Sequence, residues 1–105
     1  MIRIVKMTFD PNSVKEFLDI FETSKHLIRN FDGCSCLELL NDDSDKTIFF
    51  TYSIWESEAH LNAYRNSELF ISVWNKTKIL FSVSSSKIIF ILSPLPKLVS
   101  EAALP

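Results

Sequence analysis

The stretch from Ile48 to Phe70 limits the possible folds more than any other part of the chain. Residues 47–55 are rich in β-branched and aromatic side chains, and they alternate between two distinct faces, which predicts a strand. One face is apolar, whereas the other mixes aromatic rings and hydroxyls: Thr47, Phe49, Thr51, Ser53 and Trp55. Ser57 is a suitable cap for a helix that runs to Arg65, and Ser67 for a second helix. The stretch therefore predicts a strand that turns at once into a broken helical segment.

Three further strands and one long helix are predicted around this stretch. The helix begins after Asn12 or Ser13, ends near Asn30, and carries apolar residues at helical spacing on one side. Gly33 is the only glycine of the chain, and we expect it to adopt a positive φ just past this helix. The remaining strands are predicted at residues 2–9, 34–41 and 87–92.

The order of these elements is β-α-β-β-α-β. Joined by right-handed crossovers, it predicts an α+β fold of the ferredoxin-like kind, an antiparallel sheet with its helices on one face. We expect one domain over residues 1–92, which includes a polar break at 82–86. Pro94 and Pro96 end the last strand, and residues 93–105 are expected to form a C-terminal tail or arm.

The first and last strands are apolar on both faces, which the helices of such a fold cannot cover. In the first strand Val5 and Met7 share one face, while Ile2 and Ile4 point to the other. A second copy of the chain is the simplest cover for the remaining face. The pattern therefore predicts a homodimer packed through its sheet faces, with a small cavity between sheet and helices or beside the interface.

Composition and motifs exclude several classes of protein. The formal charge of −2 over 105 residues offers no basic face for nucleic acid. No apolar run approaches a membrane span, and Arg3 and Lys6 interrupt the early apolar run that a signal peptide would need. Cys34 and Cys36 lie two residues apart on a strand, a poor spacing for a disulfide or a metal motif. They are expected to be small buried thiols in a reducing cytoplasm.

No cofactor is predicted from the sequence. A chain with one glycine has no glycine-rich loop for a nucleotide or flavin phosphate. Neither His26 nor His60 has a partner at metal-ligand spacing, and His26 is expected on the surface. The acidic turn 42–45 lacks the spacing and glycine of a calcium loop, so it is interpreted as a solvated hairpin.

Several segments resemble the antibiotic-biosynthesis-monooxygenase-like domains. They are the opening strand 2–9, Phe31-Asp-Gly-Cys34, Phe50-Thr-Tyr-Ser-Ile-Trp55-Glu-Ser-Glu-Ala, and Tyr64-Arg-Asn-Ser-Glu-Leu-Phe70. The resemblance covers residues 1–92 and implies a dimeric α+β barrel. That family includes cofactor-free oxygenases of polycyclic phenols and quinols, haem-degrading enzymes and isomerases of small sugar-derived signals. The haem-degrading branch has Asn, Trp and His where this chain has Val5, Tyr64 and Trp74, so haem cleavage by that mechanism is not expected.

The resemblance leads to the hypothesis of a cofactor-independent monooxygenase acting on a small aromatic or quinol-type compound. Such an enzyme needs a base, hydrogen bonds to an enolate or phenolate, and an apolar pocket. The candidate catalytic residues are His60, because an unperturbed imidazole has a pKa near neutrality, and Tyr64, near the position where many relatives carry a histidine. The candidate substrate-binding residues are Thr51, Tyr52, Ser53, Trp55, Asn62, Asn66 and Trp74.

Each candidate also has a structural interpretation. The aromatic residues are equally suited to a core or an interface, and His60 to an exposed first turn of a helix. The alternative hypothesis is a non-oxidative dimer that binds or isomerises a small metabolite, because the sequence contains no dependable base. A third is a purely structural dimer.

Overall fold

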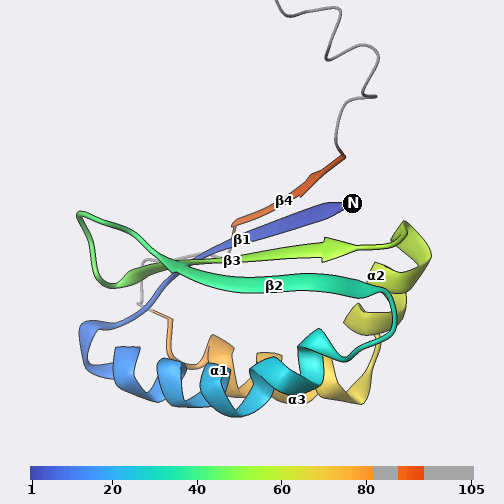
Figure 1. The fold of residues 1–105 in the computed structure, drawn as a ribbon. Coiled ribbons are helices and arrows are strands. Elements are labelled where there is room, and N and C mark those ends of the chain that lie inside the picture. The colour runs from blue at the N-terminus through green and yellow to red at the C-terminus, as the bar shows by residue number, and fades with distance from the viewer. Residues whose placement is uncertain (82–87, 94–105) are drawn as a thin grey trace, which may run out of the picture.

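The computed structural model describes residues 1–81 and 88–93, and it is an α+β fold with the predicted order of elements. The predicted polar break at 82–86, and all but Ser93 of the predicted tail, lie outside the described residues. Figure 1 shows helices α1 and α3 side by side beneath one face of the sheet, with α2 at its end. The strands are β1 (Ile2–Thr8), β2 (Cys34–Asn41), β3 (Ile48–Trp55) and β4 (Ile88–Leu92). The helices are α1 (Val14–Arg29), α2 (Glu58–Arg65) and α3 (Glu68–Lys78), and a short 3₁₀ turn η1 (Pro11–Ser13) comes directly before α1.

The sheet has the strand order β2-β3-β1-β4, and every neighbouring pair is antiparallel. Arg3 on β1 lies opposite Ser53 on β3 and opposite Ile91 on β4. This order, with helices on one face, is the ferredoxin-like arrangement that the sequence predicts. Among the described residues, no helix is long and apolar enough to cross a membrane.

Two serines start the paired helices, as their position after the strand predicts. The Ser57 hydroxyl accepts a hydrogen bond from the His60 backbone N–H at 3.2 Å, and the Ser67 hydroxyl accepts one from Phe70 at 3.1 Å. Each cap satisfies an N–H that has no partner inside its helix. The strand-to-helix turn is thus fixed locally, and it delivers α2 and α3 to the inner face of the sheet.

Gly33 joins the end of α1 to β2 with a φ of 88°, as the sequence predicts. A Cβ at this position would overlap Cβ and Cγ of His60 on α2. A glycine is therefore required at this position for two reasons, its positive φ and the close approach of the His60 side chain.

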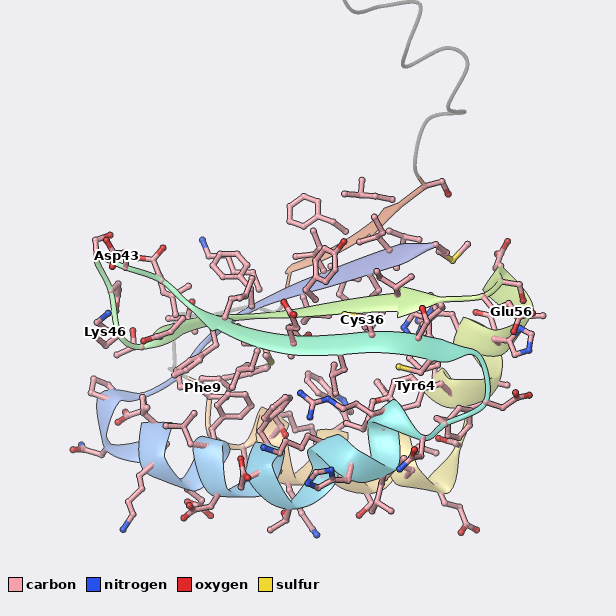
Figure 2. The ribbon with its side chains drawn as sticks, in the orientation of Figure 1. Phe9, Cys36, Asp43, Lys46, Glu56 and Tyr64 are labelled. Atoms are coloured by element: carbon pink, nitrogen blue, oxygen red, sulfur yellow. The ribbon has the colours of Figure 1, made fainter. Side chains whose placement is uncertain are left out.

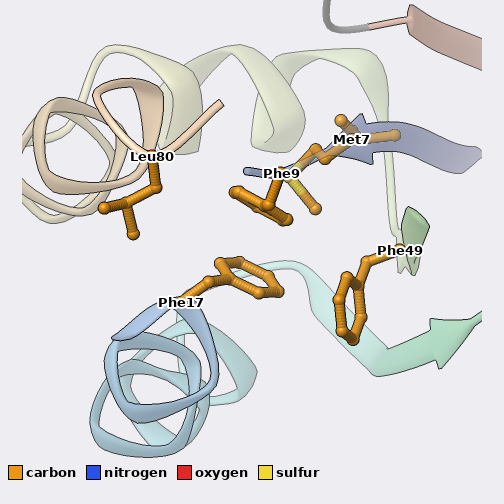
Figure 3. Close-up of a cluster of buried hydrophobic side chains, with 6 residues drawn as sticks. Met7, Phe9, Phe17, Phe49 and Leu80 are labelled. Atoms are coloured by element: carbon orange, nitrogen blue, oxygen red, sulfur yellow. The ribbon is translucent and has the colours of Figure 1, made fainter. Parts of the chain in front are cut away.

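The inner face of the sheet holds two hydrophobic clusters, one towards each end. The first centres on Phe9, which is 1% exposed and stacks on Phe17 with ring centroids 4.1 Å apart (Figure 3). The second contains Trp55, also 1% exposed, and Tyr64. Figure 2 shows Phe9 and Tyr64 at opposite ends of the space between sheet and helices. The two clusters anchor the helices and leave the middle of the interior less densely filled.

The outer face of the sheet is apolar, and none of the described helices covers it. In the register, Ile4 is flanked by Tyr52 and Phe90 on this face. Three of its apolar side chains are about half exposed: Leu40 at 49%, Phe90 at 49% and Leu92 at 48%. Apolar side chains exposed together on one face are a common feature of interaction sites.

Candidate functional site

A cavity of about 80 Å³ lies between the inner face of the sheet and the helices, bordered by both hydrophobic clusters. Its sheet side includes Thr51 and Ser53 of β3. Its helix side includes Phe70 and Trp74 of α3, and Tyr64 of α2 closes one end. The cavity exists because the inward-facing residues of β3 between the bulky Phe49 and Trp55 are Thr51 and Ser53, whose side chains are short.

The aromatic end of the cavity is held by stacking and by a short hydrogen-bond chain. The rings of Trp55 and Tyr64 stack with centroids 4.8 Å apart, and Phe70 meets Tyr64 edge-on at 5.2 Å. Trp55 Nε1 donates to Ser53 Oγ at 3.0 Å, and Ser53 Oγ donates to the carbonyl of Arg3 at 3.4 Å. Such contacts fix the rings beyond what burial alone does, so this wall is preorganised for a flat ligand.

Burial raises the pKa of the Tyr64 hydroxyl to about 12, although the charge of Arg3 acts in the opposite direction. Tyr64 is only 6% exposed, and an anion at that position would lose most of its hydration. At neutral pH the hydroxyl is therefore protonated. It can donate a hydrogen bond to a ligand, but it is a poor base.

His60 does not line the cavity. Its Nδ1 lies 2.7 Å from the Ser57 hydroxyl, and its Nε2 lies 3.6 Å from Asp32 and 3.8 Å from Glu56. The ring packs against Gly33 at the outer end of α2. Its contacts therefore tie the start of α2 to the turn before β2, and they direct the imidazole away from the inner face.

The structure gathers some of the sequence-predicted residues and separates others. Five line the cavity: Thr51, Ser53, Trp55, Tyr64 and Trp74. Tyr52 points to the outer face, where it pairs with Ile4 and Glu38. Asn62 on α2 and Asn66, which caps the C-terminus of this helix, are exposed, and the Asn66 side chain donates to the Asn62 carbonyl at 2.9 Å. These last three, like His60, cannot contact a ligand in this cavity without rearrangement.

Arg3 lines the same cavity and was not among the residues expected there. It is 7% exposed, its Cζ lies 5.8 Å from the centre of the Phe70 ring, and its Nε has no hydrogen-bond partner. Burial lowers the pKa of Arg3 from its ordinary value, Tyr64 raises it, and the neighbouring Arg65 lowers it. The signal for Arg3 was present in the sequence, since the period of a strand places it on the same face as Val5.

Neither thiol nor any acidic cluster forms a metal site in the part of the chain that the structure describes. No group of three or more His, Cys, Asp or Glu residues there could hold a metal ion. Cys34 and Cys36 are free and half-buried rather than fully buried, and the Cys34 thiol lies 3.6 Å from the carbonyl of Cys36. Burial raises the pKa of the Cys34 thiol, which disfavours the reactive thiolate.

The cavity can bind and orient a flat apolar molecule and offer it hydrogen-bond donors. No carboxylate or imidazole belongs to its lining among the described residues. Proton removal from a ligand therefore depends on the acidity of the ligand itself and on charge stabilisation by the walls.

Comparison with known proteins adds the family. No curated protein matches the chain. A crystal structure of an antibiotic biosynthesis monooxygenase superimposes with a TM-score of 0.82 at 15% identity, over 91% of this chain and 100% of the other. Rv0793 from Mycobacterium tuberculosis has a TM-score of 0.81 at 16% identity, over 91% and 95% of the two chains. PA3566 from Pseudomonas aeruginosa has a TM-score of 0.78 at 21% identity, over 90% and 93%.

At these identities the structural likeness establishes the fold. The sequence itself matches the family model described as antibiotic biosynthesis monooxygenase over residues 1–73, from β1 into α3. This match includes the cavity-lining residues of β1, β3 and α2. The chain belongs to the antibiotic biosynthesis monooxygenase family.

Proposed function

We propose that the protein is a cofactor-independent monooxygenase acting on a small aromatic or quinol-type compound. The observation that carries the proposal is the cavity between sheet and helices, walled by Trp55, Tyr64 and Trp74. Membership of the family supports the reaction type, since relatives are named for monooxygenase activity. Aromatic walls with a few convergent donors are the usual features of a site for a flat organic ligand.

In the proposed reaction the substrate supplies the electrons. A hydroxyl group of the quinol ionises, and the resulting phenolate reduces O₂ as a bond forms between a ring carbon and oxygen. One oxygen atom stays on the ring, and the other leaves as water with two hydrogens of the substrate, so that a hydroquinone becomes a hydroxyquinone. The protein's part is to bind the ring, exclude water and stabilise the developing negative charge on oxygen.

The size of the cavity favours a single-ring substrate. Its volume of about 80 Å³ is well below the roughly 300–1,000 Å³ of sites for drug-sized ligands. A polycyclic compound would require the aromatic walls to move apart, which would break the stack of Trp55 on Tyr64.

We further propose that the protein works as a homodimer packed through the outer faces of its sheets, in the cytoplasm. The apolar outer face supports the dimer, and two free cysteines suit a reducing compartment. Phe50 of β3 pairs with Leu40 on the outer face, and Phe50→Glu should convert the dimer to a monomer in light scattering. Leu27→Glu, on the exposed side of α1 at 60% exposure, is the matched control and should leave the mass unchanged. A wild-type monomer at micromolar concentration would contradict this part of the proposal.

Oxygen uptake tests the activity. The purified protein should consume O₂ above the autoxidation background with at least one member of a panel of single-ring hydroquinones. Trp74→Ala should reduce this rate, whereas His26→Gln, on the exposed side of α1, should not. Uptake no faster than the background across the whole panel would refute the monooxygenase.

A second candidate function is non-oxidative binding or isomerisation of a small metabolite by the same dimer. It is favoured by the lack of a carboxylate or imidazole in the cavity lining of the described residues. Saturable ligand binding with no oxygen uptake would identify this function. Oxygen uptake that follows the same saturation curve would exclude it.

A further inference from the structure

We infer that Arg3 makes the cavity selective for small organic anions, with its guanidinium binding an anionic oxygen of the ligand while the aromatic walls hold a flat apolar body. The inference rests on the same cavity as the proposed function and names the charge of its ligand. It holds equally for a substrate that is oxidised and for a ligand that is only bound.

The first observation is a buried cation without an acidic partner. Arg3 is 7% exposed, and its Nε is a buried donor that has no acceptor. No carboxylate forms an ion pair with it among residues 1–81 and 88–93, where the Lys25–Glu22 pair and the contacts of His60 are the ion pairs present. Leaving a buried cation and its donor unsatisfied is costly, so such a group calls for a functional explanation.

The second observation is the electrostatic surroundings of the guanidinium. The charged and polar groups that act on Arg3 are the Tyr64 hydroxyl and a second cation, Arg65. Among residues 1–81 and 88–93, no acidic side chain acts on Arg3. The guanidinium is therefore buried without a compensating negative charge, which favours a bound anion over a neutral molecule of the same shape.

The third observation concerns the other polar groups of the cavity, most of which are already engaged. Ser24 and Thr77 donate to carbonyls of their own helices at 2.7 Å. Ser53 accepts from Trp55 and donates to a backbone carbonyl. Within the described residues, Arg3 Nε is the buried side-chain atom without a hydrogen-bond partner. The lining also contains the hydroxyls of Thr51 and Tyr64, and all three groups can donate a hydrogen bond to an anionic oxygen.

The fourth observation is that neighbouring residues hold Arg3 in a fixed position. Its backbone is paired on both sides, to Ser53 of β3 and Ile91 of β4. Its guanidinium carbon lies 5.8 Å from the Phe70 ring centre, within the range of a cation–π contact. A planar guanidinium held in this way can present two parallel N–H groups to a carboxylate, or one to a phenolate or enolate oxygen.

Ligand selectivity tests the inference without any oxygen chemistry. The two tryptophans of the chain, Trp55 and Trp74, both line the cavity, so quenching of intrinsic fluorescence reports its occupancy. Benzoate and 4-hydroxybenzoate are titrated against their neutral amides, under anaerobic conditions. The wild type should bind each acid at least about tenfold more tightly than its amide, as a charge-assisted hydrogen bond implies.

The variants separate binding from folding. Arg3→Met should remove the preference for the acids, and Arg3→Lys should retain part of it, since the charge remains but the planar fork is lost. Lys15→Gln removes the same charge from the exposed side of α1 and should keep the preference within about twofold. Far-UV circular dichroism of each variant shows whether it is folded.

Two results would overturn the inference. One is a wild type that binds acid and amide equally well, or binds neither acid saturably. The other is a folded Arg3→Met variant that still prefers the acids. Since no oxygen is consumed in this assay, a failed oxygen-uptake experiment leaves the result standing, and the reverse also holds.

Discussion

Replacing Tyr64 by Phe should change how the stability of the protein depends on pH, while changing little at neutral pH. The phenyl ring keeps the stack on Trp55 at 4.8 Å and the edge contact with Phe70 at 5.2 Å. The hydroxyl that is lost has no hydrogen-bond partner among the described residues. Below pH 10 we therefore expect the free energies of unfolding of variant and wild type to agree within about 1 kcal/mol.

The pKa of Tyr64 gives the size and sign of the effect in alkali. Burial raises this pKa from 10.0 in the unfolded chain to about 12 in the folded protein. Below pH 10 the hydroxyl is protonated in both states and the wild type has its full stability. Between pH 10 and 12 the unfolded chain releases the proton while the folded protein retains it, so stability falls. The total loss is roughly 3 kcal/mol.

Urea unfolding of the wild type at a series of pH values measures this loss, and the Tyr64→Phe variant serves as the reference. Lysines and thiols also titrate in alkali, but they do so equally in wild type and Tyr64→Phe. The difference between the two curves should therefore grow from near zero at pH 10 towards roughly 3 kcal/mol at pH 12. Parallel curves would show that the hydroxyl is not buried as the structure has it, and would refute the assignment of a protonated donor in the cavity.

Three further substitutions test other parts of the structure. Gly33→Ala should lower the free energy of unfolding by roughly 2–4 kcal/mol, through its positive φ and the overlap with His60, and an unchanged urea midpoint would contradict this. Phe9→Ala should cost about 3–5 kcal/mol, far more than Leu18→Ala at a site that is 41% exposed, and equal costs would show that the first cluster is not the core. Arg3→Met should raise the melting temperature of the ligand-free protein, because it removes a buried cation that has no acidic partner, and a lower one would mean that the charge serves the fold.

The fold was predictable because its signals are local and repeated. Alternation in 47–55, the caps Ser57 and Ser67, and the single glycine at position 33 each specify one feature of the backbone. Their order then leaves one common arrangement. The outer face shows the same logic, since Ile2 and Ile4 of β1 and alternate residues of β3 from Ile48 to Ile54 are mostly apolar where no described helix covers them.

The site was only partly predictable, because the type of a side chain does not show its direction. Tyr52 was grouped with Thr51 and Ser53 for its hydroxyl, although the period of the strand places it on the opposite face. His60 was chosen for its titration range. Its position is decided by local contacts, with Ser57 at 2.7 Å and with the glycine turn, which sequence periodicity does not report.

Arg3 shows why the site was harder to predict than the fold. A charged residue near the start of an apolar strand is usually interpreted as facing solvent, and that interpretation hides it. The period of the strand gives the opposite answer, since it places Arg3 on the same covered face as Val5 and Met7. A buried cation without an acidic partner contradicts the local rules that the rest of the chain follows, and such conflicts in natural proteins concentrate at functional sites. The residue that fits the fold least well is therefore the one that best identifies the chemistry of the cavity.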